Sequence, residues 1–254
     1  MTSGIRSELR DDHIRTITMD YPPVNALPVT GWFELAHALD DASRDQSTHV
    51  VILRAEGKGF NAGVDIKEMQ NTEGFDALIG ANKGCFAAFK AVYECAVPVV
   101  AAVNGFCLGG GVGLVGNADC VVASDDAYFG VPEVKQGALG AATHMARLVP
   151  QHLMRTLYFT ARTISATSLV QHGSVLETAP RADLDEAALA IARDIAQHDT
   201  RVIRAAKEAL NGIDPIDVNK SYRFEQGFTM ELNLAGVSDE HRDKFAGTNK
   251  GSNK

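Results

Sequence analysis

Two short stretches of the sequence carry groups that could stabilise an enolate and move a proton beside it. The first is a run of three glycines, Gly109 to Gly111, which follows the apolar run 98–103 and precedes an apolar, helix-permissive segment. A strand that ends in glycines and opens a helix leaves backbone N–H groups free, where they stabilise an anion or a developing oxyanion. The second is the segment 129–133 (FGVPE), which sets the carboxylate of Glu133 in apolar surroundings. Together they indicate enolate chemistry rather than nucleophilic catalysis.

The glycine run is weak evidence by itself, because many such turns only allow a helix to pack closely on a sheet. Two common phosphate-binding patterns are absent from the sequence. It contains no GxxxxGK(S/T) loop, and its glycines do not form GxGxxG followed by a suitably placed acidic residue. The choice left is between oxyanion stabilisation and close packing.

Composition narrows the class of protein. The chain has 254 residues, 45% hydrophobic and 22% charged, as in an ordinary globular protein with a large core. The net charge of −8 disfavours a nucleic-acid partner, since phosphate binding needs a basic surface. No apolar run approaches the roughly 20 residues of a membrane span, and the N-terminus lacks the apolar region of a signal peptide. The four cysteines show no CxxC spacing, which indicates a cytoplasmic protein with reduced thiols and no metal.

Apolar runs in the first half of the chain predict strands that alternate with helices. Continuous apolar runs are typical of strands covered on both faces, and alternation over 13–19 is typical of a half-buried strand. Strands alternating with helices favour right-handed crossovers and a mostly parallel sheet. We expect strands at 13–19, 49–54, 98–103 and 119–124, and helices at 29–43, 64–69 and 75–93.

From His144 onward the strand signals vanish and the pattern is helical. The sequence therefore predicts the α/β class, with a core over residues 1–198 and a helical C-terminal region over residues 199–254. The helices expected in this part of the chain span 151–160, 166–172, 183–198, 202–211 and 215–245.

Longer motifs carry a family resemblance. Residues 52–69 (ILRAEGKGFNAGVDIKEM) resemble the first signature of the crotonase, or enoyl-CoA hydratase/isomerase, superfamily, and residues 104–111 (NGFCLGGG) with 129–133 resemble the second. Residues 23–27 and 159–166 match further landmarks, so the resemblance covers nearly the whole chain. It implies a spiral core of ββα turns, a helical C-terminal region that forms a homotrimer or a dimer of trimers, and an acyl-CoA thioester as substrate.

The resemblance also implies roles for individual residues. The thioester oxygen is expected between the backbone N–H groups of Val64 and Gly110, where each preorganised donor stabilises an enolate by about 3 kcal/mol. Asp65 and Glu68 are also expected to cap the short helix and face solvent. No metal or redox cofactor is implied, because coenzyme A is part of the substrate. Contacts with coenzyme A are expected from Lys58, Ala62, Asp65, Ile66 and Lys67, and the alternative for the two lysines is that they are solvated loop residues.

The sequence departs from the hydratase pattern at one catalytic position. Hydratases carry two glutamates that hold one water; here the first position is Gly113 and the second is Glu133. Ordinary hydratase activity should therefore be crippled, and the missing side chain at Gly113 is expected to enlarge the pocket. The loop after Glu133 is shorter than in hydratases and introduces His144, either a further acid or base or a packing residue at a helix start.

Several segments resemble one subgroup of this family, the hydrolases that open the five-membered ring of a bicyclic indanedione-carboxyl-CoA in steroid degradation. These segments are residues 55–70, 93–98, 134–151, 199–210 and 225–236. Such C–C cleavage adds water to a ring ketone and expels a carbanion. If that carbon is conjugated with the thioester, the electrons form a dienolate in the oxyanion hole. One base then suffices, and Glu133 is the candidate, with a pKa that an apolar pocket would raise.

Two alternatives stay open. A Δ3,Δ2-enoyl-CoA isomerase also needs one carboxylate beside an enolate, and a non-catalytic acyl-CoA-binding homologue would need none.

Cys95 and Cys107 are interpreted as core residues. Tyr222 and Glu225, in the C-terminal region, could close the pocket of the same or of a neighbouring subunit.

Overall fold

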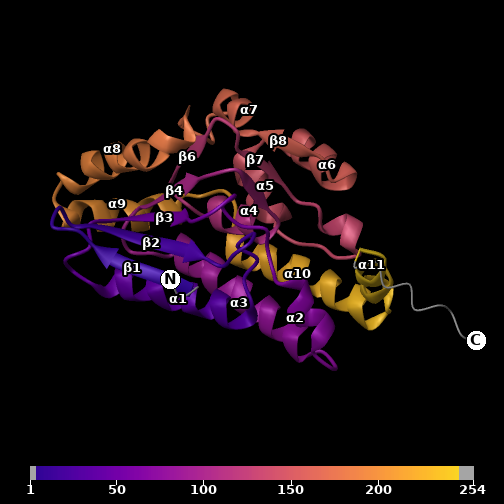
Figure 1. Ribbon diagram of the computed structural model, residues 1–254. Helices are drawn as coiled ribbons and strands as arrows, with labels where there is room; N and C mark the ends of the chain where they lie inside the picture. The colour runs from indigo at the N-terminus through magenta and orange to yellow at the C-terminus, as the bar shows by residue number, and fades with distance from the viewer. Residues whose placement is uncertain (1–3, 246–254) are drawn as a thin grey trace, which may run out of the picture.

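A six-stranded sheet lies at the centre of the protein (Figure 1). The computed structural model describes residues 4–245. The first strand pairs antiparallel with the second, and every later neighbour in this sheet pairs in parallel, as the alternation of strands and helices predicts. In spatial order the strands are β1 (Gly4–Leu9), β2 (Ile14–Asp20), β3 (Val50–Ala55), β4 (Val99–Val103), β6 (Cys120–Ser124) and β9 (Glu177–Ala179).

A second sheet of three short strands lies beside the first. Strand β5 (Phe106–Leu108) pairs in parallel with β7 (Tyr128–Gly130), which pairs antiparallel with β8 (Thr163–Ser165). This sheet holds the glycine turn, because β5 ends one residue before Gly109 and the N–H of Gly109 donates to the carbonyl of Gly130. The prediction that strands end before His144 is wrong, since β8 and β9 both follow it.

Helices cover both faces of the large sheet. On one face α1 (Val29–Arg44) and α3 (Asp76–Tyr93) pack on each other and on the sheet, and α8 (Leu184–Ala196) covers the other face (Figure 1). Alternate residues of β3 serve the two sides: Leu53 belongs to the core with α1 and α3, and Ile52 to the core with α8. The continuous apolar run at 49–54 is therefore explained by burial on both faces.

The remaining helices connect the strands and form the C-terminal region. The expected helix over 215–245 is two helices, because the chain turns at Gly236 with φ +76°. These elements are α2 (Ile66–Asn71), α4 (Gly110–Val115), the 3₁₀ turn η1 (Glu133–Gln136), α5 (Ala142–Leu148), α6 (Gln151–Thr160), α7 (Ala166–Gln171), the 3₁₀ turn η2 (Arg181–Asp183), α9 (Thr200–Gly212), α10 (Val218–Leu234) and α11 (Val237–Phe245).

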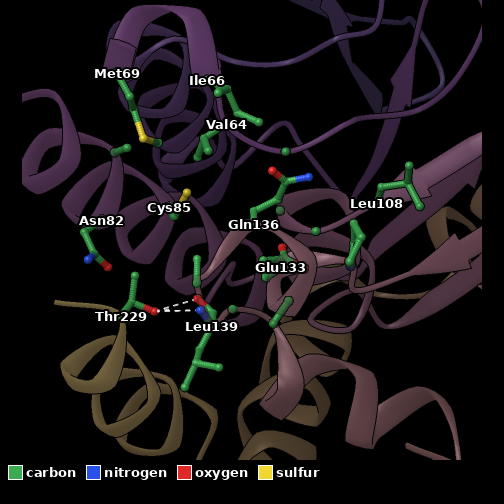
Figure 2. Close-up of a pocket in the computed structure, with 18 of the residues that line it drawn as sticks. Val64, Ile66, Met69, Asn82, Cys85, Leu108, Glu133, Gln136, Leu139 and Thr229 are labelled. Carbon is green, nitrogen blue, oxygen red and sulfur yellow. Dashed lines mark hydrogen bonds between the residues drawn. The ribbon is translucent and has the colours of Figure 1, made fainter. Parts of the chain in front are cut away.

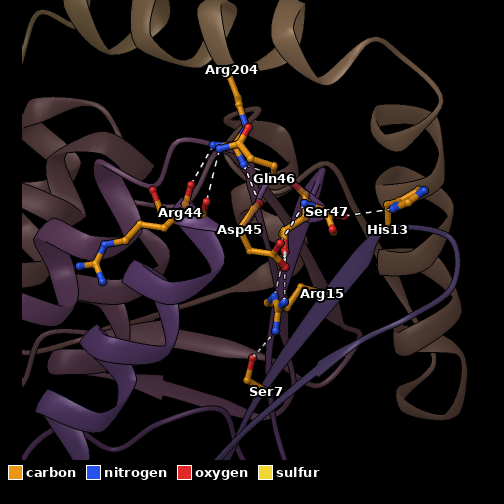
Figure 3. A network of polar contacts seen from close by, with 10 residues as sticks. Ser7, His13, Arg15, Arg44, Asp45, Gln46, Ser47 and Arg204 are labelled. Carbon is orange, nitrogen blue, oxygen red and sulfur yellow. Dashed lines mark hydrogen bonds and ion pairs between the residues drawn. The ribbon is translucent and has the colours of Figure 1, made fainter.

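Helix α9 is held to the core by two basic side chains, the buried Lys207 and the half-buried Arg204. The Lys207 ammonium donates to both carboxylate oxygens of Asp119 at 2.7 and 2.8 Å, and its side chain is 3% exposed. Arg204 donates to the carbonyl oxygens of Ser43, Asp45 and Thr48, so it fixes the loop after α1 (Figure 3). The division predicted after residue 198 stays a prediction, but the region beyond it is docked on the core by these contacts.

Candidate active site

A cavity of about 500 Å³ lies between the two sheets' connecting loops and the C-terminal helix α10 (Figure 2). Its wall is formed by the segment before α2, one face of α3, the start of α4, the turn η1, the loop that follows it, and α10. Most of the lining is apolar, with Val64, Met69, Leu78 and Leu108 among it. An acyl group can therefore be held away from water here.

Glu133 is directed into this cavity from the first position of η1. Its Oε1 lies against the Cα of Gly109, so closely that any Cβ at that position would overlap with it. Gly109 also has φ +54°, a conformation that favours glycine. The glycine turn and the carboxylate, far apart in sequence, are thus in direct contact.

Burial controls the ionisation of Glu133. Burial, opposed by a backbone hydrogen bond and assisted by the nearby charge of Glu225, raises the pKa of Glu133 from its usual 4.5 to about 8. Its Oε2 is buried, and no group in the described part of the chain donates a hydrogen bond to it. In its ionised form such a carboxylate is a stronger base than an ordinary glutamate, which suits a general base.

The backbones of the predicted oxyanion donors lie side by side. A Cβ on Gly63 would lie 3.4 Å from the nitrogen of Gly110, and a Cβ on Gly110 would lie 3.3 Å from the Cα of Gly63. Gly110 is the first residue of α4, so its N–H has no acceptor within the helix. Neither this N–H nor that of Val64 donates any hydrogen bond found among residues 4–245. Both residues line the cavity, and their role as donors stays a prediction.

Buried asparagines fix the segment that carries Val64. Asn61 is fully buried, its Oδ1 accepts from the N–H of Gly63 at 2.8 Å, and its Nδ2 donates to the carbonyl of Asn25 at 2.6 Å. Asn25 in turn donates to the carbonyls of Glu56 and Gly59. The sequence analysis did not predict this pair. An asparagine inside a glycine-rich motif was a signal that its amide forms hydrogen bonds with the backbone.

Of the five residues predicted to contact coenzyme A, some line the cavity and others do not. Ala62 and Ile66 line the cavity. Asp65 caps α2, since its Oδ1 accepts from the N–H of Lys67 and of Glu68. Lys58 and Lys67 are not among the residues that line the cavity, so their contact with coenzyme A stays a prediction.

Glu68 differs from its expected place on a solvent-facing helix surface. Its Oε2 accepts from the N–H of Val29 at 2.8 Å, so it satisfies a donor at the start of α1 rather than of its own helix. The carboxylate therefore links α2 to α1 beside the cavity.

The expectation that Gly113 enlarges the pocket is wrong. The ring of Phe89 on α3 occupies the space next to Gly113, and a Cβ on the glycine would overlap with it. Phe89 lines the cavity, whereas Gly113 does not. The space of the missing side chain is filled from another helix, which sequence spacing does not reveal.

His144 is brought near the site but not into the cavity lining. It is 1% exposed and packs edge-on against the rings of Phe89 and Tyr222, with centroids 4.9 and 5.0 Å away. Burial, with a smaller contribution from Arg147, lowers the pKa of His144 from 6.5 to about 3. The neutral ring fits a packing role better than that of an acid.

Helix α10 closes the cavity of its own chain. Tyr222 and Thr229 line the cavity. Glu225 lies behind it, where its Oε1 accepts from the N–H of Ala142 at 3.0 Å and from the hydroxyl of Tyr158 at 3.0 Å. Glu225 thus caps α5 and holds the loop that follows Glu133. Cys95 and Cys107 are buried core residues, as predicted.

No cluster of three or more His, Cys, Asp or Glu side chains within residues 4–245 is arranged to bind a metal ion. Over the same residues, every helix is too short or too polar to span a membrane.

Comparisons with known proteins fit this geometry. The chain is 69% identical to a (7aS)-7a-methyl-1,5-dioxo-2,3,5,6,7,7a-hexahydro-1H-indene-carboxyl-CoA hydrolase of Rhodococcus jostii (strain RHA1), over 97% of this chain and 96% of the relative. It is equally 69% identical to the hydrolase of the same name from Mycobacterium tuberculosis (strain ATCC 25618 / H37Rv), over 95% and 98%. A crystal structure of an enoyl-CoA hydratase/isomerase from Xanthobacter autotrophicus Py2 superposes with a TM-score of 0.83 at 27% identity, covering 91% of this chain and 88% of that one.

The family is also shown by its sequence profile, Enoyl-CoA hydratase/isomerase, which matches residues 10–235. The predicted fold is confirmed, with the C-terminal helices in place. From the sequence profile, the hydrolase relatives and the shared fold together, this protein is a member of the enoyl-CoA hydratase/isomerase, or crotonase, family.

Proposed function

We propose that this protein is an acyl-CoA hydrolase that opens the five-membered ring of the methyl-dioxo-hexahydroindene-carboxyl-CoA for which its 69% identical relatives are named. The observation that supports this most directly is a single buried carboxylate, Glu133, in contact with the glycine turn and facing an apolar cavity. Such a site has one base and room for a compact hydrophobic acyl group.

The substrate's structure explains why one base suffices. Its name places ketones at carbons 1 and 5 and a methyl group at carbon 7a, and the hydrogenated positions leave one ring double bond, between carbons 3a and 4. Carbon 7a therefore lies next to the carbon 1 ketone and is allylic to that double bond. When the bond between carbons 1 and 7a breaks, the electron pair is delocalised over the conjugated system rather than left on one carbon.

The reaction then follows in three steps. Glu133 takes a proton from water, and the hydroxide adds to carbon 1. The bond between carbons 1 and 7a breaks, carbon 1 becomes a carboxyl group, and the pair enters a dienolate whose oxyanion the N–H groups of Val64 and Gly110 stabilise. Glu133 returns its proton to carbon 7a. One water is consumed, and the glutamate ends as it began.

An enoyl-CoA isomerase is the second candidate, because it also requires a single carboxylate beside an oxyanion hole. The apolar wall of the cavity suits a linear chain as well as a bicycle. A third candidate function is acyl-CoA binding without catalysis. It predicts that a substitution at Glu133 has no effect on product formation.

The deciding experiment is product analysis by mass spectrometry in oxygen-18 water, with wild type and Glu133→Gln in parallel. The bicyclic thioester is the test substrate and a linear 3-enoyl-CoA is the control. We expect one labelled oxygen in a new carboxyl group with wild type and none with the variant. Double-bond migration in the linear substrate, with the bicycle unchanged, would support the isomerase instead.

The assembly and the location of the protein are part of the proposal. A homotrimer or a dimer of trimers is expected from the family resemblance, and light scattering coupled to gel filtration measures it directly. Cytoplasmic localisation is expected because the substrate is a coenzyme A thioester.

A further inference from the structure

Two residues that line the cavity each carry a buried side-chain oxygen without a donor among the described residues. These oxygens are Oε2 of Glu133 and Oε1 of Gln136, and no group in the described part of the chain donates to either. Both residues line the cavity (Figure 2). An acceptor buried in this way is unfavourable unless a donor reaches it, so each oxygen marks a place where a donor is expected.

The backbone puts these two side chains on one face. Glu133 and Gln136 are the first and last residues of the 3₁₀ turn η1, and residues three apart in such a turn lie one above the other. Pro132 precedes the turn and Gly137 ends it in a left-handed conformation with φ +65°, which fixes its length. The two side chains therefore leave the turn on the same face.

Thr229 in the cavity wall and Glu225 behind it are already engaged. The hydroxyl of Thr229 donates to the carbonyl of Leu139 at 2.7 Å and accepts from its N–H at 3.1 Å (Figure 2). The Oε1 atom of Glu225 accepts hydrogen bonds from the N–H of Ala142 and the hydroxyl of Tyr158. Position 113, which would carry the second carboxylate of a hydratase, holds a glycine covered by Phe89. Gln136, three residues after the base on the same turn, has a buried acceptor to offer.

We propose that Gln136 is a catalytic residue that holds the hydrolytic water together with Glu133, each through one buried acceptor oxygen. A water molecule has two hydrogens to donate, and two acceptors on one face of one turn match them. This assignment rests on the proposed function, because an isomerase needs no such water.

In the proposed hydrolysis, every bond that forms or breaks is accounted for. One hydrogen of the water goes to Glu133 as a proton, while the other stays on oxygen and donates to Oε1 of Gln136. The oxygen forms its bond to carbon 1, the bond between carbons 1 and 7a breaks, and the pair is held in the dienolate. The proton on Glu133 then passes to carbon 7a. Gln136 is never protonated, so a neutral amide is sufficient for its role.

Two activities of the same site separate this role from a structural one. Ring opening needs the water, the base and the oxyanion donors. Exchange of the carbon 7a hydrogen of the ring-opened product with deuterium oxide needs only the base and the oxyanion donors, because it reverses the last proton transfer. Loss of Gln136 should therefore affect the first activity and spare the second.

The experiment compares Gln136→Met, which keeps the length of the side chain without an acceptor, with Gln136→Glu, which restores acceptor oxygens. Gln46→Met is the matched control, because Gln46 lies on an exposed loop away from the cavity. Thermal unfolding is recorded for each to confirm that the variants fold. Ring opening is followed by labelled product in oxygen-18 water, and exchange by mass spectrometry of the purified product.

We expect Gln136→Met to slow ring opening on the order of 100-fold, the cost of a misplaced reactant, with exchange within about threefold of wild type. Gln136→Glu should recover part of the ring opening at high pH, where the base is ionised beside the added charge. Equal loss of both activities in Gln136→Met, or loss of neither, would overturn the assignment and leave the hydrolase function intact. Failure of wild type to open the ring would overturn the function itself.

Discussion

The ring of Phe89 on α3 lies where a side chain on Gly113 of α4 would be, so that any Cβ at position 113 would overlap with it. Phe89 is 2% exposed and packs edge-on against Trp32 and His144. The aromatic ring is thus fixed from several sides. The absence of a carboxylate at position 113 therefore leaves no open space, because an aromatic ring fills the place of the polar side chain.

This relationship predicts that Gly113→Ala destabilises the protein although alanine is the better helix former. Overpacking of a buried site costs about 1–3 kcal/mol, against the roughly 1 kcal/mol that alanine gains over glycine in a helix. In the double variant with Phe89→Ala the added methyl group fills part of the cavity left by the ring. Urea unfolding of the wild type, both single variants and the double variant measures the coupling. Strictly additive changes would show that the ring does not fill this space.

Most of the fold could be predicted because its long elements depend on local pattern. The helix expected at 151–160 is found at Gln151–Thr160, and the apolar runs became buried parallel strands. Four of the missed strands, β5, β7, β8 and β9, have three residues each, too few for a period to be visible, and the six-residue β1 was missed as well. The four short strands exist because they pair with distant segments, which no local pattern encodes.

The site was predictable where a backbone conformation or a charge depends on a particular residue type. Glu133 and the glycine turn are of this kind, and the structure brings them into contact. Phe89 and Gln136 were missed because an aromatic residue on a helix, or a glutamine after a Pro-Glu pair, has many uses. Only the packing of α3 and the turn η1 shows where these two side chains point.

The raised pKa of Glu133 predicts the pH dependence of catalysis. A base must be ionised, so kcat/KM should rise with pH through an apparent pKa of about 8. Cys85 from α3, Tyr158 from α6 and Glu225 from α10 face this carboxyl group, and Glu225 raises its pKa. Glu225→Gln keeps an acceptor for Ala142 and removes the charge, so the rise should move to lower pH.

Rate profiles from pH 5 to 10 test this expectation. Tyr158→Phe is the matched control, because it removes a hydrogen bond to Glu225 without removing a charge. A profile of Glu225→Gln that rises at the same or a higher pH than that of wild type contradicts the electrostatic explanation.

His144 predicts a pH dependence of stability rather than of rate. Its pKa is lowered to about 3 in the folded protein, whereas the unfolded chain takes up a proton below 6.5. Its contribution is therefore fully present above pH 6.5 and is lost as pH falls toward 3, by on the order of 2 kcal/mol at pH 5. His144→Phe should remove this dependence and keep the rise of kcat/KM with pH. Urea unfolding at pH 7 and 5 measures the first, and a lost or shifted rate profile would restore His144 as a catalytic group.

The pair of Lys207 and Asp119 predicts how firmly α9 is held on the core. Asp119→Ala leaves the buried ammonium of Lys207 unpaired and also removes the acceptor of the Val99 N–H, so we expect a loss of about 3–5 kcal/mol. The double variant with Lys207→Met should be more stable than Asp119→Ala alone, because the unpaired charge is gone. Urea unfolding monitored by Trp32 fluorescence gives both values. Equal stability of the two variants would mean that the ammonium reaches water in the single variant.

Asn61 predicts a catalytic effect from a residue that touches no substrate. Its amide accepts from Gly63 and donates to Asn25, so Asn61→Ala leaves a buried N–H and a buried carbonyl unpaired, at about 1–3 kcal/mol each. The segment carrying Val64 should then be free to shift, which misplaces one oxyanion donor and lowers kcat on the order of 10- to 100-fold with little change in KM. Asn61→Asp keeps the acceptor for Gly63 and loses only the donor to Asn25, so it should retain more of kcat than Asn61→Ala. Steady-state kinetics of both variants, at a temperature where unfolding curves show them folded, decides the matter: a change confined to KM would mean that this network serves substrate binding and not the oxyanion.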